Sequence, residues 1–477
     1  MKPLNRQTAD KPNQRPVKVL QFGEGNFLRG FVDWMVDVLN ERTGFNGAVD
    51  VVQPRDRSRR TIQALRQQEG LYHVLLKGIQ GGKLTQQQRL ITCIASALNP
   101  YDDYQAYLRR GENPDLRLIF SNTTEAGIAY DEQDTGIDRI AASFPGKLTA
   151  LLYHRFRHFG GAADKGLIVI PTELIENNGA ALRSFVLQYA QSWDLPQDFA
   201  AWVKAHVIFC NTLVDRIVPG FPQDTIREVQ QELGYEDTLV VTAEPYHLLV
   251  IEAPESVRQA FPAEAAGLQV KFVSDLTPYR TSKVRILNGA HTTLVPVAYL
   301  HGLRTVQEAV EDAEVGPFIR EAIYTEIVPT LDMPQEELEQ FASDVLERFR
   351  NPFIRHELLS ISLNSVSKYK VRVLPSVLAY INRHGRQPER LLHALAALIL
   401  FYRGEWRGEK IPLNDSHDVL QFFEKAWQLG DAAAVVAAVL ANTDFWDTDL
   451  TQVSGLQATV AAQVAQLQQT DKQTPAA

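Results

Sequence analysis

VKVLQFGEGNFLRG, residues 17–30, joins a short β-prone run to a helical pattern through two glycines. The run over residues 17–22 is rich in branched and aromatic side chains, which favours a strand. Amphipathic helical spacing then continues to about residue 41, and a second strand is expected at 48–53. A strand, a tight turn, a helix and a second strand predict a parallel sheet with crossover helices.

The same alternation continues through the N-terminal half and then gives way to helices. A hairpin is expected at 72–79 and 84–93, buried strands at 116–121 and 166–170, and the last convincing strand at 270–273. Helical patterns lie near 101–110, 145–159 and 179–192, and then at 305–328, 335–349, 353–370, 388–402 and 432–441. We therefore predict an α/β domain over residues 16–278 and a mostly α-helical domain over 279–465, with loose tails at 1–15 and 466–477.

The composition limits the classes of function. The chain has 477 residues, a formal net charge of -9 and two cysteines, Cys93 and Cys210. An acidic chain is a poor partner for nucleic acid or a membrane surface, and two cysteines imply no disulfide framework. No apolar run is long enough to span a bilayer, and residues 1–15 carry no stretch of signal-peptide type. We expect a cytoplasmic protein that binds neither nucleic acid nor membrane.

The two glycines after the first strand predict a nucleotide site. Gly23 and Gly25 would let backbone N–H groups approach a pyrophosphate at the positive end of the following helix. The third glycine of the usual dinucleotide fingerprint is replaced by Leu28. A tight turn without a ligand therefore remains the alternative.

The end of the second strand bears on the choice of nucleotide. Gln53 stands where an acid would bind the ribose 2′-hydroxyl, and Asp56 follows a few residues later. The basic cluster around them would either bind a 2′-phosphate or form a solvated face; its members are Arg55, Arg57, Arg59 and Arg60.

Polar residues also follow the strand at 116–121. Thr124, Glu125 and Gly127 belong to the run SNTTEAG, residues 121–127. The carboxyl end of a strand in an open α/β sheet is a usual place for a ligand. The alternative is a helix N-cap, since Thr and Glu are common where helices begin.

KVRILNGAH, residues 283–291, carries a candidate catalytic set. On an α-helix His291 lies about 80° and Asn288 about 140° around the axis from Lys283. Lysine can act as an acid–base group, an amide can stabilise an alkoxide, and histidine can orient a hydroxyl. The alternative is a surface lysine, a capping asparagine and a core histidine.

Basic residues gather again between 348 and 372. Arg348, Arg355, Lys368 and Arg372 form a candidate carboxylate or phosphate site in an otherwise acidic chain. A solvated helical face is the alternative. No grouping of His, Cys, Asp and Glu has metal-ligand spacing, so no metal site is expected.

Taken together, these segments resemble the polyol-specific long-chain dehydrogenases, the mannitol dehydrogenase family. The matching motifs, in family order, are FGEGNFLR at 22–29, TEAG at 124–127, VDRIVP at 214–219, KVRILNGAH at 283–291 and RFRNP at 348–352. The resemblance implies an N-terminal Rossmann-type domain, a helical C-terminal domain, NAD as cofactor and catalysis without a metal ion. It places Phe22, Gly23, Gly25, Asn26, Phe27, Thr124, Glu125 and Gly127 at the cofactor.

The resemblance also implies roles at the reacting carbon. Lys283 would be the acid–base group, Asn288 would stabilise the alkoxide, and His291 and Asp215 would position hydroxyls. The chain departs from the family at Leu174, which replaces an oxyanion asparagine, although Asn178 is kept as a substrate contact.

We expect a small sugar-acid substrate, whose carboxylate is held by Arg348, Arg355, Lys368 or Arg372. Another uronate, a neutral polyol, or a non-catalytic binding role on the same fold are the alternatives.

Overall fold

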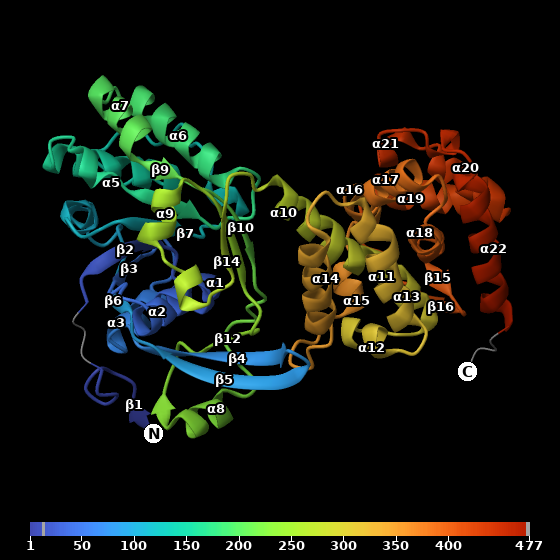
Figure 1. Cartoon of the computed structure of the whole chain (residues 1–477), viewed down its shortest axis with the longest axis horizontal. Coiled ribbons are helices and arrows are strands. Elements are labelled where there is room, and N and C mark those ends of the chain that lie inside the picture. Colours follow the sequence, from blue (N-terminus) through green and yellow to red (C-terminus); the bar gives the residue numbers. More distant parts are fainter. Residues whose placement is uncertain (12–14, 474–477) are drawn as a thin grey trace. The chain divides into compact units, whose positions relative to one another are not determined.

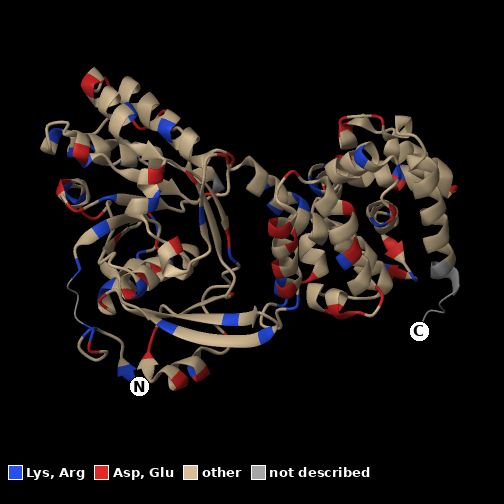
Figure 2. Cartoon of the chain, viewed as in Figure 1, with Lys and Arg blue, Asp and Glu red and all other residues tan. Residues whose placement is uncertain are grey.

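The computed structural model describes residues 1–11 and 15–473, which divide into two compact units, Met1–Leu276 and Thr277–Ala477 (Figure 1). Lys and Arg lie interspersed with Asp and Glu along the helices of both units (Figure 2). None of the described helices is long and apolar enough to cross a bilayer.

Unit 1 is built on a six-stranded parallel sheet in the order β6-β3-β2-β7-β8-β9. Alternate residues of a strand point to opposite faces, so Val19 packs with the helices of one face and Leu20 with those of the other. This arrangement confirms the predicted α/β fold with a parallel sheet. The strands are β2 (Val17–Phe22), β3 (Ala48–Val52), β6 (Ile94–Leu98), β7 (Leu118–Ser121), β8 (Ile168–Pro171) and β9 (Ile208–Phe209).

Helices cover both faces of this sheet. One face carries α2 (Val32–Arg42) and α3 (Arg60–Gln67). The other carries α5 (Phe144–His158), α6 (Asn178–Ser192) and α7 (Gln197–His206), which lie together in Figure 1. Shorter helices complete the unit: α1 (Asn26–Gly30), α4 (Tyr104–Leu108), α8 (Ile226–Leu233) and α9 (Glu255–Ala260).

Two three-stranded sheets extend unit 1. The predicted hairpin is confirmed as β4 (Tyr72–Gln80) and β5 (Lys83–Ile91), and β12 (Val241–Ala243) adds parallel to β4. The other sheet contains β10 (Asn211–Asp215), β13 (Leu248–Glu252) and β14 (Val270–Val273). The carboxyl end of β10 thereby places Asp215 opposite Leu248.

The start of the chain is not a loose tail. β1 (Lys2–Pro3) pairs with β11 (Tyr235–Glu236), and Leu4 is buried. Arg6 donates to the carbonyls of Thr92 at 3.1 Å and Ile94 at 2.7 Å. The prediction of a tail is therefore wrong for residues 1–11, because these polar residues bond to unit 1; residues 12–14 lie outside the described residues.

Unit 2 is helical apart from the short hairpin β15 (Glu405–Trp406) and β16 (Glu409–Lys410), which the sequence pattern did not reveal. Its core packs α11 (Gly289–His301) against α18 (Glu389–Phe401). The other helices are α10 (Thr277–Ser282), α12 (Val306–Glu311), α13 (Val315–Glu321), α14 (Gln335–Phe349), α15 (Leu358–Ile361), α16 (Ser365–Arg372), α17 (Leu374–His384), α19 (His417–Trp427), α20 (Ala432–Leu440), α21 (Thr443–Trp446) and α22 (Leu456–Gln473).

Three predictions for unit 2 are wrong. The helix expected over 305–328 is interrupted between α12 and α13. The helix expected over 353–370 is broken into α15 and α16, because Asn364 takes a left-handed conformation with φ 52° between them. The tail expected from residue 466 continues as α22, with Leu467 packed against the core, since its apolar spacing persists. Residues 474–477 lie outside the described residues.

Candidate active site

The glycine turn after β2 leaves an open approach to the start of α1. Gly23 has φ +133°, and a Cβ there would lie 2.8 Å from Leu28 Cδ1 and 3.1 Å from the Asn122 carbonyl. Gly25 caps α1 without any side-chain hydrogen bond, and a Cβ on it would meet nothing within 4 Å. The turn therefore requires glycine at Gly23 and leaves space at Gly25 where a phosphate can meet the N–H groups of the helix.

The other residues predicted at this turn mostly pack within the protein. The Phe22 ring is fully buried and contacts Phe144 with 4.9 Å between centroids. Phe27 stacks on Phe31, and Asn26 Oδ1 accepts from Arg29 at 2.6 Å. Phe22 thus supports the turn from the core, and its expected place at the cofactor stays a prediction.

The loop after β3 is held by internal bonds. Gln53 is fully buried, donates to the Ser58 carbonyl at 3.2 Å and accepts from Asn99 at 3.2 Å. Two of the arginines are paired with acids. Arg57 lies 2.6 Å from Glu24, and Arg59 lies 3.0 Å from Asp56 and 2.9 Å from Asp102. These pairs neutralise much of the basic cluster that a 2′-phosphate would need.

A cavity of about 290 Å³ lies where β3 and β7 end. Its walls include Pro54, Arg55, Thr123, Tyr130 and Phe144. Nucleotides in open α/β sheets bind at the carboxyl ends of the strands. The cavity therefore lies at the edge of the sheet where a nucleotide is expected.

A buried carboxylate organises the loop after β7. Glu173 accepts from the N–H and hydroxyl of Thr123, both at 2.9 Å, and from the Ser121 hydroxyl at 3.0 Å. Burial raises the pKa of Glu173 despite these bonds. The sequence analysis missed this residue, although an acid directly after a buried strand was its signal.

The same loop is tightly constrained. Thr124 is held at φ +103°, and a Cβ on Gly127 would lie 2.0 Å from Thr123 Oγ1. Backbone strain of this kind collects at ligand sites. Residues Glu125–Gly127 form a 3₁₀ turn, and the side chain of Glu125 lies outside what the structure describes.

The side chain of Asn178 makes hydrogen bonds to other residues of unit 1. Its amide nitrogen donates to the carbonyls of Pro171 and Glu173 and to Thr212 Oγ1, at 3.0–3.2 Å. Its oxygen accepts from Gly179 and Thr212, both at 2.9 Å. Every polar group of this side chain therefore has a protein partner in unit 1, and the expected substrate contact stays a prediction. Asp215 is 7% exposed at the end of β10.

The predicted catalytic lysine begins a π-helical segment, Lys283–Asn288. Hydrogen bonds in a π-helix run from residue i to i+5, so Lys283 and Asn288 lie closer around the axis than the α-helical angle predicted. Gly289 then begins α11, and a Cβ on it would lie 3.1 Å from the Arg372 carbonyl. This close approach explains why a glycine follows Asn288.

His291 lies in a shielded, strongly basic environment. Its ring stacks on Phe349 at 4.2 Å and meets the ring of His356 at 5.1 Å. Its Nε2 atom is buried and has no hydrogen-bond partner among the described residues. Burial holds the pKa of His291 well below its usual range, and His356, Arg348, Arg372 and Lys368 lower it further.

The cations around His291 are themselves partly or largely buried. Burial lowers the pKa of Lys368, Arg372 and His356, and Arg372 adds to the effect on Lys368. Arg348 is 8% exposed. The sequence analysis missed His356, because it lies in the irregular segment that replaces the expected helix.

Arg355 is not brought to this cluster. Its side chain is 80% exposed and lies 2.5 Å from Glu357. Three of the four basic residues predicted to hold a carboxylate therefore surround His291, and the fourth is a surface ion pair.

Metal-ligand groupings of three or more His, Cys, Asp or Glu are not found in residues 1–11 and 15–473.

The sequence matches two family models. The mannitol dehydrogenase Rossmann domain matches residues 17–264, and the mannitol dehydrogenase C-terminal domain matches residues 275–468. Curated relatives include the altronate oxidoreductase of Bacillus subtilis (strain 168), 49% identical over 97% of this chain and 95% of its own. Another is the altronate oxidoreductase of Escherichia coli O1:K1 / APEC, 49% identical over 97% of this chain and 96% of its own.

Solved structures share the fold. A D-sorbitol dehydrogenase in substrate-free form has a TM-score of 0.79, at 23% identity over 98% of this chain and 99% of its own. The mannitol 2-dehydrogenase of Pseudomonas fluorescens, in a ternary complex with NAD and D-mannitol, has a TM-score of 0.66, at 23% identity over 99% of this chain and 98% of its own.

Proposed function

Because the chain belongs to the mannitol dehydrogenase family, we propose that it is an altronate oxidoreductase, which interconverts D-tagaturonate and D-altronate with NAD. Family membership confirms the resemblance inferred from the sequence. The chain is an oxidoreductase that acts on CH–OH groups. The identity of 49% to named altronate oxidoreductases supports this substrate.

The basic residues around His291 are the observation that favours a sugar acid over a neutral polyol as the substrate. A buried Nε2 without a partner lies among cations whose pKa values are lowered by burial and by one another. A carboxylate would give Nε2 an acceptor and would bring a negative charge among these cations. Each charge-assisted bond contributes roughly 1.5–3 kcal/mol, which a neutral polyol would not gain.

The proposed chemistry assigns one role each to Lys283, Asn288 and Asp215. Bound reduced nicotinamide supplies a hydride to the keto carbon of the substrate. Lys283, as an ammonium group, donates a proton to the developing alkoxide, which gives the secondary alcohol. Asn288 stabilises the alkoxide by donating from its amide. Asp215 orients a substrate hydroxyl, and this acid–base chemistry requires no metal ion.

The cofactor is proposed to be NAD rather than NADP. Arg57 and Arg59, which would bind a 2′-phosphate, are paired with Glu24, Asp56 and Asp102. An added phosphate would have to displace these carboxylates.

The test is a parallel assay of NADH and NADPH oxidation with tagaturonate, fructuronate and fructose. We expect the highest kcat/KM with tagaturonate and NADH. A preference for fructuronate would assign the other uronate, and a preference for fructose would assign a neutral polyol. No turnover with any pair would favour a non-catalytic binding role. The expected cytoplasmic location stays a prediction.

A further inference from the structure

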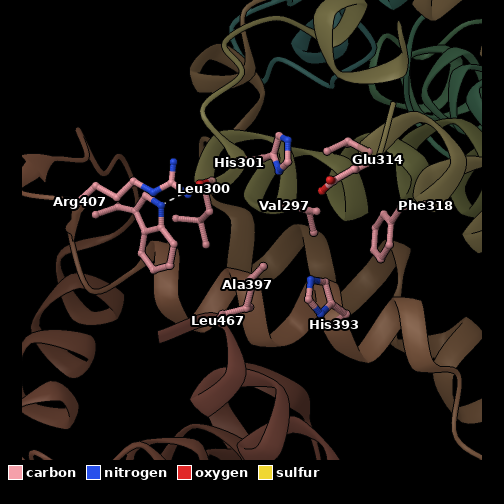
Figure 3. Close-up of a pocket in the computed structure, with 11 residues that line it drawn as sticks. Val297, Leu300, His301, Glu314, Phe318, His393, Ala397, Arg407 and Leu467 are labelled. Atoms are coloured by element: carbon pink, nitrogen blue, oxygen red, sulfur yellow. Dashed lines mark hydrogen bonds between the residues drawn. The ribbon is translucent and has the colours of Figure 1, made fainter. Parts of the chain in front are cut away.

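A second cavity of about 320 Å³ lies within unit 2 (Figure 3). Its lining includes His301, at the far end of α11 from His291. Ten residues of α-helix separate these two histidines by about 15 Å. The cavity is therefore a different site from the cluster around His291.

The cavity has an apolar floor and polar ends. Val297 and Leu300 of α11, Ala397 of α18 and Leu467 of α22 form the floor. Arg407 and Glu314 lie toward opposite sides of the view in Figure 3, with His301 between them. Such a lining, mostly apolar with a few placed polar groups, is typical of small-molecule sites.

Arg407 is held in a strained conformation. It occupies the two-residue turn between β15 and β16, with φ +49°, followed by Gly408 with φ +76°. Asn, Asp or Gly usually takes the first position of such a turn, because a longer side chain is disfavoured there. Backbone strain of this kind clusters at ligand sites, and Arg407 lines this cavity.

The aromatic walls of the cavity are fixed in place. Trp406 Nε1 donates to the Leu300 carbonyl at 2.7 Å, which ties the hairpin to α11. Phe318 meets the ring of His393 edge-on at 5.5 Å. Burial lowers the pKa of His393, which disfavours a charge on this imidazole. Flat walls suit a ring-shaped ligand.

We infer that this cavity binds a small aromatic carboxylate that carries a hydrogen-bond donor at its opposite end. The guanidinium of Arg407 pairs with the carboxylate, because its planar donors match that geometry. The ring lies over the apolar floor beside Trp406, and Glu314 accepts from the distal donor. The volume is at the low end of the roughly 300–1000 Å³ range of ligand sites, which suits a single ring.

The test is isothermal titration of the full-length protein with 4-hydroxybenzoate, with benzylamine as the cationic comparison. We expect 4-hydroxybenzoate to bind and benzylamine not to bind. Arg407→Asn should weaken binding by about ten-fold or more while keeping the melting temperature, since Asn tolerates positive φ. Lys410→Asn, in the same hairpin, is the matched control and should bind like the unchanged protein. Glu314→Gln should weaken binding of 4-hydroxybenzoate more than that of benzoate.

The active-site cluster is the competing location for these probes. Arg372→Gln should leave probe binding unchanged. Loss of binding in Arg372→Gln but not in Arg407→Asn would place the probe beside His291 and overturn the inference. Absence of binding by the unchanged protein, or equal affinity in Arg407→Asn, would also overturn it.

Discussion

The ring of Phe349 lies on that of His291, with 4.2 Å between the centroids and 25° between the planes. Phe349 ends α14, directly after Arg348, so the same helix end supplies an apolar wall and a cation beside His291. An apolar wall lowers the local dielectric, which strengthens charged contacts to a ligand and raises the cost of leaving charges unmatched.

Substitution of Arg372 should separate acidic from neutral substrates. We expect Arg372→Gln to raise KM for tagaturonate by about ten-fold or more, the equivalent of one charge-assisted bond. KM for fructose should change much less. Arg355→Gln is the matched control, because Arg355 is exposed and paired with Glu357. Equal losses on both substrates would show that Arg372 is structural.

Removal of the proposed acid–base group should affect turnover rather than cofactor binding. Lys283→Ala should lower kcat by about 10²–10⁴-fold. The dissociation constant for NADH, measured by fluorescence, should stay unchanged, since the glycine turn belongs to unit 1. A near-normal kcat would refute the role.

The two glycines of the cofactor turn should respond differently to alanine. Gly23→Ala forces a Cβ against Leu28 at a positive φ and should lower the melting temperature. Gly25→Ala enters open space and should keep the melting temperature while weakening NADH binding. Unchanged NADH affinity in Gly25→Ala would mean that the space is not occupied by the cofactor.

The free energy of unfolding should fall as the pH rises, because the buried Asp33 carboxyl favours its protonated form in the folded protein. Burial raises the pKa of this carboxyl from 3.8 to about 7, although Tyr72 and Gln21 hydrogen bonds oppose the shift. The folded state therefore favours the protonated form. The contribution of this carboxyl to the free energy of unfolding is complete below about pH 4 and is lost as the pH rises through about 7. Denaturant unfolding from pH 4.5 to 8 should show a steeper decline than in Asp33→Asn; identical slopes would contradict the shift.

Activity should survive prolonged treatment with EDTA and dialysis, because proton donation by Lys283 needs no Lewis acid. Loss of activity that zinc restores would reject the lysine mechanism.

The parallel sheet and the glycine turn were predictable because their signals are local: branched residues at 17–22 and glycines directly after them. The angle between Lys283 and Asn288 was predicted for an α-helix. The structure has a π-helical segment there, which the spacing of apolar residues does not reveal. The resemblance to the family suggested Asn178 as a substrate contact. The sequence could not show that Thr212, remote along the chain, both donates to and accepts from the Asn178 amide. Arg355 and Arg372 were equivalent as charges, and only tertiary packing separates them.

The pairing of β1 with β11 has a practical consequence for handling the protein. Leu4 is buried and Arg6 caps the carbonyls of Thr92 and Ile94. Deleting the first eleven residues would strip these carbonyls of their donor and uncover the edge of β11. Recombinant protein should therefore keep residues 1–11. Removing them for crystallisation should give a preparation that is less stable and more prone to aggregate.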